Sequence, residues 1–100
     1  MDWLKHPENG RVLASVFFKR GSVLEYVRPG TVFKTVHADK MVEMATVLSV
    51  ATDSFGIPHI RFRVSFRRPD QHMFDGGDRL LALKTFAERY TERVPDQIAA

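Results

Sequence analysis

The sequence predicts a mainly β fold, a strongly curled antiparallel sheet built on a long hairpin of residues 41–52 and 57–67. Many of the residues in 41–52 are β-branched, which lowers helix propensity and suits a pleated surface. Residues 53–57 between the strands contain the turn formers aspartate, serine and glycine. The second strand alternates polar residues with apolar ones, which is typical of a half-buried strand. Its apolar residues are Ile60, Phe62, Val64 and Phe66.

The core-facing residues of both strands have even numbers, and this predicts how the strands pair. If Thr52 lies opposite Pro58, the core-facing residues of the second strand meet residues of the same parity on the first. A slip of one residue would turn the arginines of the second strand toward the core. The same register places Glu43 opposite Arg67, a favourable cross-strand charge pair. The first-strand residues expected to face the core are Met44, Thr46, Leu48 and Val50.

The first forty residues hold shorter elements. Residues 1–10 read as an irregular lead-in, in which Trp3 and Leu4 are apolar enough to anchor it. Residues 11–20 fit an N-terminal helix that ends before a glycine, or a strand that turns through that glycine into a strand at 22–27. The pattern slightly favours the helix.

A turn at Arg28–Thr31 separates the strand at 22–27 from the next one. Proline in its second position and glycine in its third suit a type II turn. Alternation then predicts a strand over 31–37, followed by a short connection into 41–52.

The C-terminal third predicts a loop and a helix. Residues 69–78 are polar and rich in glycine, which indicates a loop. Residues 85–94 favour a short helix, since Ala, Glu and Arg are good helix formers and Pro95 stops it. Residues 79–84 fit either an extension of this helix or a closing strand, and 95–100 read as a loose tail.

Short connections between long strands favour a sheet that curls around a small core. The arrangement resembles a small SH3-like barrel at the level of fold, and no family motif accompanies the resemblance. The alternative is an open antiparallel sheet that terminal helices cover on one face. Either form makes residues 1–100 a single domain, because 100 residues suit one core.

Composition narrows the class of protein. An apolar content of 44% is ordinary for a globular chain. The absence of cysteine excludes disulfides, thiolate metal sites and a cysteine nucleophile. There is no secretory signal at the N-terminus and no apolar stretch long enough for a transmembrane helix, so we expect a cytoplasmic protein without membrane association.

Charge is unevenly distributed along the chain. Residues 1–68 hold eleven Lys or Arg against six acidic residues, whereas residues 69–100 hold four against six. A basic first part with an acidic end is compatible with binding of nucleic acid or an acidic partner.

The polar face of residues 57–67 is the first candidate site. Arginines two residues apart on a strand lie about 6.6 Å apart, which roughly suits successive phosphates of an extended single strand. An aromatic side chain at the turn could stack on a base. This predicts a non-enzymatic binding module for RNA or single-stranded DNA, with the candidate residues Arg61, Arg63, Arg67, His59, Phe55 and Lys34.

The alternative is a protein-interaction or assembly domain, either a homo-oligomer or a subunit of a larger complex. Its basis is the short chain, the apolar ends and the prospect of an unpaired edge strand. An enzyme is not expected, since His37 and His59 fit no catalytic or metal-binding spacing. The sequence therefore predicts no catalytic residue, metal ligand or cofactor.

Overall fold

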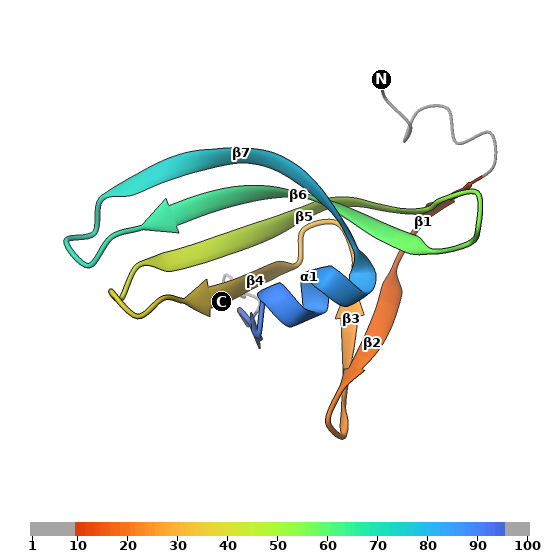
Figure 1. Ribbon diagram of the computed structural model, residues 1–100, viewed down its shortest axis with the longest axis horizontal. Helices are drawn as coiled ribbons and strands as arrows, with labels where there is room; N and C mark the ends of the chain where they lie inside the picture. The colour runs from red at the N-terminus through yellow and green to blue at the C-terminus, as the bar shows by residue number, and fades with distance from the viewer. Residues whose placement is uncertain (1–9, 96–100) are drawn as a thin grey trace, which may run out of the picture.

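The computed structural model describes residues 10–95 of the chain (Figure 1). Residues 1–9 of the predicted lead-in, including Trp3 and Leu4, and residues 96–100 of the predicted tail lie outside the described residues. The described elements, in order, are β1 (Val12–Leu13), β2 (Val16–Arg20), β3 (Val23–Val27), β4 (Val32–Val36), β5 (Val42–Thr52), β6 (Pro58–Arg67), β7 (Met73–Ala82), α1 (Leu83–Arg89) and β8 (Glu92–Arg93).

The described strands form two antiparallel sheets. The larger sheet has the order β7-β6-β5-β4-β8, with β1 beside the turn end of β5, and β2 and β3 form a separate two-stranded sheet. Figure 1 shows the large sheet curving over α1, while β2 and β3 project away from it as an arm. The mainly β, antiparallel prediction with one short C-terminal helix is confirmed. The two sheets are not closed into a barrel, so the SH3-like form is not confirmed.

The central hairpin forms as predicted at its turn end, where Thr52 lies opposite Pro58. The register then shifts between Val47 and Ser49, which makes Leu48 the extra residue of a β-bulge. A bulge reverses which residues face the core, because successive side chains of a strand alternate between faces. The buried residues of β5 are therefore Glu43, Ala45, Val47, Val50 and Ala51.

The predicted pair of Glu43 and Arg67 is wrong because of this bulge. Glu43 lies opposite Phe66, and Arg67 lies opposite Val42. Glu43 has only 1% of its surface exposed. It therefore belongs to the interior beneath the sheet instead of the exposed face that carries the arginines.

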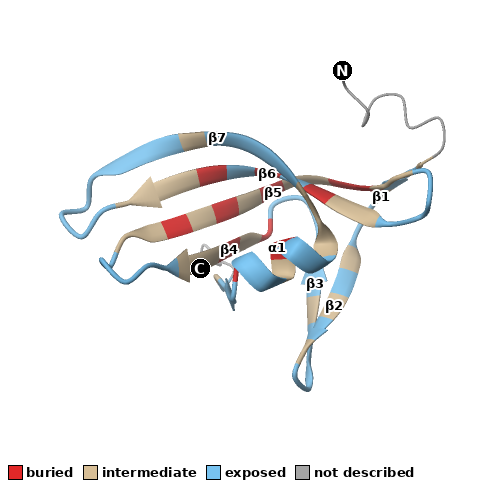
Figure 2. Ribbon diagram, in the orientation of Figure 1, coloured by how far each residue is buried: buried red, intermediate tan, exposed pale blue. Residues whose placement is uncertain are grey.

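Four aromatic rings make the centre of the core. Phe86 of α1 has its ring centroid 5.3 Å from that of Phe33 on β4 and 5.0 Å from that of Phe62 on β6. Tyr90, just after the helix, lies 5.0 Å from Phe86 and 5.4 Å from Phe62. Figure 2 shows the buried segments on β5 and β6, with α1 beneath them. The helix thus covers one face of the sheet through aromatic packing.

The predicted N-terminal helix at residues 11–20 is wrong. These residues form β1 and β2, and β2 pairs with β3 through a tight turn in which Gly21 has a φ of +63°. The strand alternative holds because Val16 and Phe18 reach the core cluster from one face of β2. The turn at Arg28–Thr31 forms as predicted, with a φ of +94° at Gly30.

The predicted loop at 69–78 is too long, because β7 begins at Met73 and pairs with β6. The register shifts there, so that Gly76 is an extra residue in β7. A Cβ on Gly76 would lie 2.6 Å from the Phe66 ring and 2.9 Å from Val64 Cγ1. Glycine is therefore required by close packing here, whereas its polar neighbours suggested a loop.

The C-terminal helix is also shorter than the predicted 85–94. It starts at Leu83 and ends at Arg89, after which β8 pairs with β4. The alternative of a strand at 79–84 holds as far as Ala82. The chain therefore turns back to the sheet before Pro95, and the proline does not end the helix.

Candidate interaction site

The β2–β3 arm carries apolar side chains on its outer face. Phe17 lies opposite Tyr26, with ring centroids 5.8 Å apart, and these residues are 60% and 55% exposed. Leu24, opposite Lys19, is exposed on the same face. Large exposed apolar residues that gather on one element are typical of binding surfaces. We call Phe17, Leu24 and Tyr26 the arm face.

The turn end of the arm is held to the domain by Arg20, the last residue of β2. Its guanidinium donates hydrogen bonds to the carbonyl oxygens of Ala87 at 3.1 Å and of Tyr90 at 2.9 Å, at the C-terminal end of α1. Cations are favourable at that end, where the last carbonyl groups lack helical partners. Phe18 packs against Phe33, with their centroids 6.4 Å apart. The arm is thus anchored on its inner face, and the arm face remains open.

A groove of about 560 Å³ lies between β2 and α1. Three consecutive residues of β2 line it, whereas the side chains of one strand face would come from alternate residues. The groove therefore follows the edge of the strand. The other wall is formed by one face of α1 and by Thr91, two residues after the end of the helix. The lining residues are Phe18, Lys19, Arg20, Leu83, Lys84, Ala87, Glu88 and Thr91.

The edge of β2 along this groove is unpaired within residues 10–95, where β2 pairs with β3 only. The longest edge strand of the described sheets, β7, differs in character. It contains Asp75, Gly76 and Asp78 and a register shift, devices that discourage pairing with another chain. The edge of β2 has no bulge and no acidic residue, and Val16–Arg20 holds three apolar residues beside Lys19 and Arg20.

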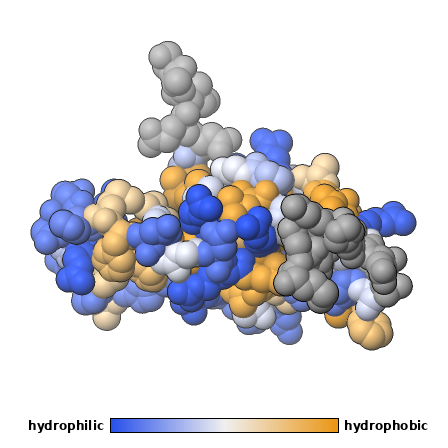
Figure 3. Space-filling view, turned by 90° about the horizontal axis from the view of Figure 1, so that it is seen from above, coloured by the Kyte–Doolittle hydropathy of each residue, from blue (hydrophilic) through white to orange (hydrophobic). Residues whose placement is uncertain are grey.

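The predicted arginine face forms, but part of it is neutralised. Arg61 and Arg63 both lie on the outer face of β6, and both bind Asp78 of β7, at 2.9 and 3.0 Å. The contact with Asp78 raises the pKa of Arg63. Arg67 lies farther along the same face, opposite Met73. Figure 3 shows hydrophobic residues interrupting the hydrophilic ones over the surface seen from above.

The other predicted site residues are spread out. Phe55 lies at the β5–β6 turn and is 86% exposed. The Nδ1 atom of His59 donates a hydrogen bond to the Ile57 carbonyl oxygen at 3.0 Å near that turn. Lys34 lies two strands away from β6 and pairs with Glu92 at 3.8 Å. The structure thus brings Arg61 and Arg63 together, and it leaves Phe55 and Lys34 apart from them.

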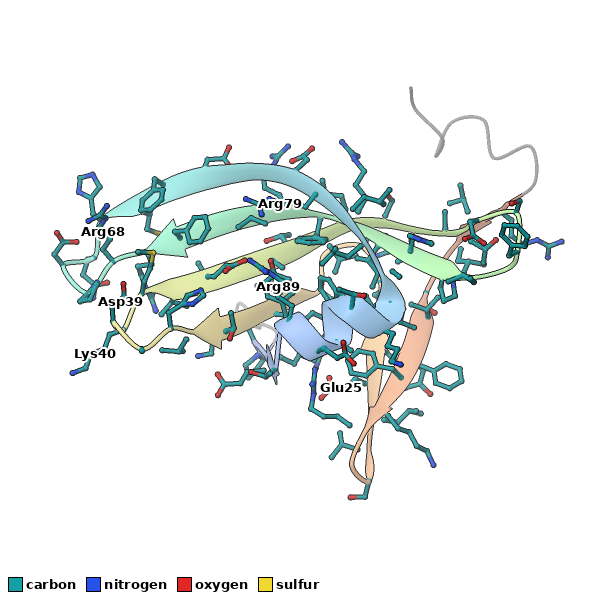
Figure 4. All side chains as sticks on the ribbon, in the orientation of Figure 1. Glu25, Asp39, Lys40, Arg68, Arg79 and Arg89 are labelled. Atoms are coloured by element: carbon teal, nitrogen blue, oxygen red, sulfur yellow. The ribbon has the colours of Figure 1, made fainter. Side chains whose placement is uncertain are left out.

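A polar cluster that the sequence did not predict surrounds Glu43. Its carboxylate accepts hydrogen bonds from the Tyr90 hydroxyl at 2.7 Å and from Arg89 at 3.1 Å. The Nε2 atom of His37 lies 3.0 Å from the other carboxylate oxygen. In Figure 4 the Arg89 side chain lies between α1 and the sheet above it. The cluster ties the end of the helix to β4 and β5.

The electrostatics of this cluster suit a structural role. Burial alone would raise the pKa of Glu43, but hydrogen bonds from Tyr90, His37 and Arg89 outweigh it and lower the pKa below 4.5. Burial and the hydrogen bond to Glu43 raise the pKa of Tyr90 to about 12. An ionised carboxylate with three donors is a weak base, so the arrangement favours fixing the helix over proton transfer.

The described residues bring no three histidine, aspartate or glutamate side chains together in a way that could hold a metal ion. In residues 10–95 we also find no helix that is both long enough and apolar enough to cross a membrane. Comparisons of the chain with protein-family models, with curated proteins and with solved structures gave no match.

The sequence does not predict the arm face, because the favoured helix at 11–20 contains Phe17, whereas Leu24 and Tyr26 lie in the predicted strand at 22–27. A signal was present in the sequence, since Phe17 and Tyr26 are equally far from the Gly21–Ser22 turn. Hairpin pairing across that turn makes them cross-strand neighbours. With Val16 and Phe18 on the core side, alternation then leaves Phe17 exposed.

Proposed function

We propose that the protein is a non-enzymatic protein-binding module whose recognition element is the β2–β3 arm. The observation that carries this proposal is the arm face, where two aromatic residues and a leucine are exposed on a two-stranded sheet with no further described strand. Aromatic side chains bring large contact area at interfaces, and they are common among residues that dominate binding energy.

The anchoring of the arm supports the same function. Arg20 and Phe18 fix its inner face to α1 and the core, so the aromatic pair is presented on a held scaffold. A pre-positioned surface loses less conformational entropy on binding than a loose one. The arginine face gives weaker support for a ligand, because Asp78 already pairs with Arg61 and Arg63.

Substitution of the arm face tests the proposal. We expect the double variant Phe17→Thr/Tyr26→Thr to lose the proteins that co-purify with the tagged chain from its native cells. If the partner is a second copy of the chain, the variant should instead lose its self-association, as measured by sedimentation. Threonine suits a strand, so the free energy of unfolding should fall by only about 1 kcal/mol. The matched control is Phe55→Thr, an exposed aromatic residue on a distant turn. Retention of every partner by the arm variant would contradict the proposal.

A second candidate function, binding of RNA or single-stranded DNA, is favoured by the placement of Arg61 and Arg63 on one exposed face. If it holds, Asp78→Asn should strengthen binding of a mixed-sequence single-stranded oligonucleotide by several-fold, because it frees both guanidinium groups. Arg63→Glu should abolish binding, and log affinity should fall linearly with log salt concentration. A flat low-salt titration for both the unmodified protein and Asp78→Asn would remove this candidate.

A further inference from the structure

We infer that the edge of β2 and its groove bind an extended, acidic peptide segment of a partner protein as an added third strand of the arm. This inference rests on the proposed protein-binding function and names the chemistry of the partner. An antiparallel strand pairs through alternate backbone groups and leaves the others pointing away, so the outer edge of β2 offers a row of donors and acceptors.

The position of the groove supports strand addition over other modes of binding. Because Phe18, Lys19 and Arg20 all line it, a ligand in the groove lies beside the backbone of β2. Its volume of about 560 Å³ is within the range of binding pockets for small ligands and suffices for a few side chains. An added strand would send every second side chain into this space.

The two faces of the added strand would meet different surroundings. Side chains on the groove side would contact the apolar floor that Phe18, Leu83 and Ala87 provide. Side chains on the opposite side would lie next to the outer face of β2, where Lys19 and Phe17 are exposed. We therefore expect apolar residues at alternate positions of the peptide and acidic residues between them.

Charge around the groove favours an acidic partner. Its lining includes Lys19, Arg20 and Lys84 against one carboxylate, Glu88. Lys19 and Lys84 form no ion pair with any of the described residues. The cavity at the β3 edge is a poorer site, since it measures only about 210 Å³; Arg28, Arg93 and the carboxylate of Glu25 are among its lining residues.

Fluorescently labelled peptides test the inference with the intact protein. The probe is a seven-residue peptide in which valine alternates with Glu and Asp, and the control peptide has lysine in place of each acid. We expect saturable binding of the acidic probe, at least about tenfold tighter than the lysine peptide, because charge reversal replaces attraction by repulsion. Equal binding of the two peptides would overturn the acidic assignment.

Backbone methylation distinguishes strand pairing from simple adhesion to the groove. In an added strand all valine amides point to one side and all acidic-residue amides to the other. N-methylation of one set should therefore abolish binding, and methylation of the other set should leave it nearly unchanged. Equal effects of the two modifications would contradict strand addition.

Two variants of the protein locate the site. Lys19→Glu should weaken the acidic probe about tenfold, whereas the matched control Lys40→Glu, on the β4–β5 turn, should not. Ala87→Leu fills the groove and should also weaken binding, with unfolding measured to show that the domain remains intact. Wild-type affinity in both Lys19→Glu and Ala87→Leu would overturn the assignment. If the peptides fail while Phe17→Thr/Tyr26→Thr still loses its partners, the inference falls and the proposed function stands.

Discussion

Replacement of Phe86 by alanine is expected to lower the free energy of unfolding by about 3–5 kcal/mol, the range for a buried phenylalanine truncated in a core. Phe86 is fully buried and packs edge-on against Phe33 and Phe62, from two different strands. Its loss would leave a cavity between α1 and the sheet. A small domain has about 5–15 kcal/mol of stability in total, so the effect is large.

Urea denaturation of Phe86→Ala measures this effect directly. Phe55→Ala is the matched control, because Phe55 is the same residue type and almost fully exposed. Its unfolding free energy should change by less than about 0.5 kcal/mol. A loss below about 1 kcal/mol in Phe86→Ala would contradict the packing of α1 on the sheet.

Glu43→Gln should destabilise the protein by about 2–3 kcal/mol. The carboxylate accepts from Tyr90, Arg89 and His37, whereas a glutamine amide offers one accepting oxygen and an NH₂ group that faces donors. The loss is smaller than for a fully buried ion pair, since Arg89 and His37 are about half exposed and water can solvate them. Glu92→Gln, on an exposed pair with Lys34, should cost less than about 0.5 kcal/mol.

The pH dependence of unfolding provides a second test of how Glu43 contributes to stability. Its pKa is lowered in the folded protein from 4.5, so its stabilising contribution is present above pH 4.5 and is lost as the pH falls through the folded-state pKa. The stability difference between the wild type and Glu43→Gln should therefore shrink below pH 4.5. A difference that is constant down to pH 2 would contradict an ionised Glu43 in the folded state.

The hairpin was predictable because its second strand alternates without interruption from Ile60 to Phe66. The opposite strand was predictable only up to the bulge, since nothing around Leu48 distinguishes a bulged residue from a paired one. The burial of Glu43 follows from that bulge, and two of its three donors, Arg89 and Tyr90, come from a distant segment. Periodicity along one strand cannot show such a tertiary contact.

Local composition also makes two strands hard to predict from the sequence. The residues around Gly76 look like a loop, and only the close approach of Phe66 explains a glycine inside β7. In residues 11–20 helical and extended spacing coincide, and pairing with β3 decided the outcome. Alternation predicts the correct strand for the exposed arginines, but it predicts a loop for the segment with Asp78, the common partner of Arg61 and Arg63.

The central claim is that the β2–β3 arm is the surface that contacts other proteins. Site-specific photo-crosslinking in native cells tests it most directly, with p-benzoylphenylalanine in place of Tyr26 or of Phe55. Both positions carry exposed aromatic residues, so we expect each of them to accept the bulky probe. We predict discrete protein adducts from position 26 and none from position 55. Adducts from position 55 alone, or none from either, would contradict the claim.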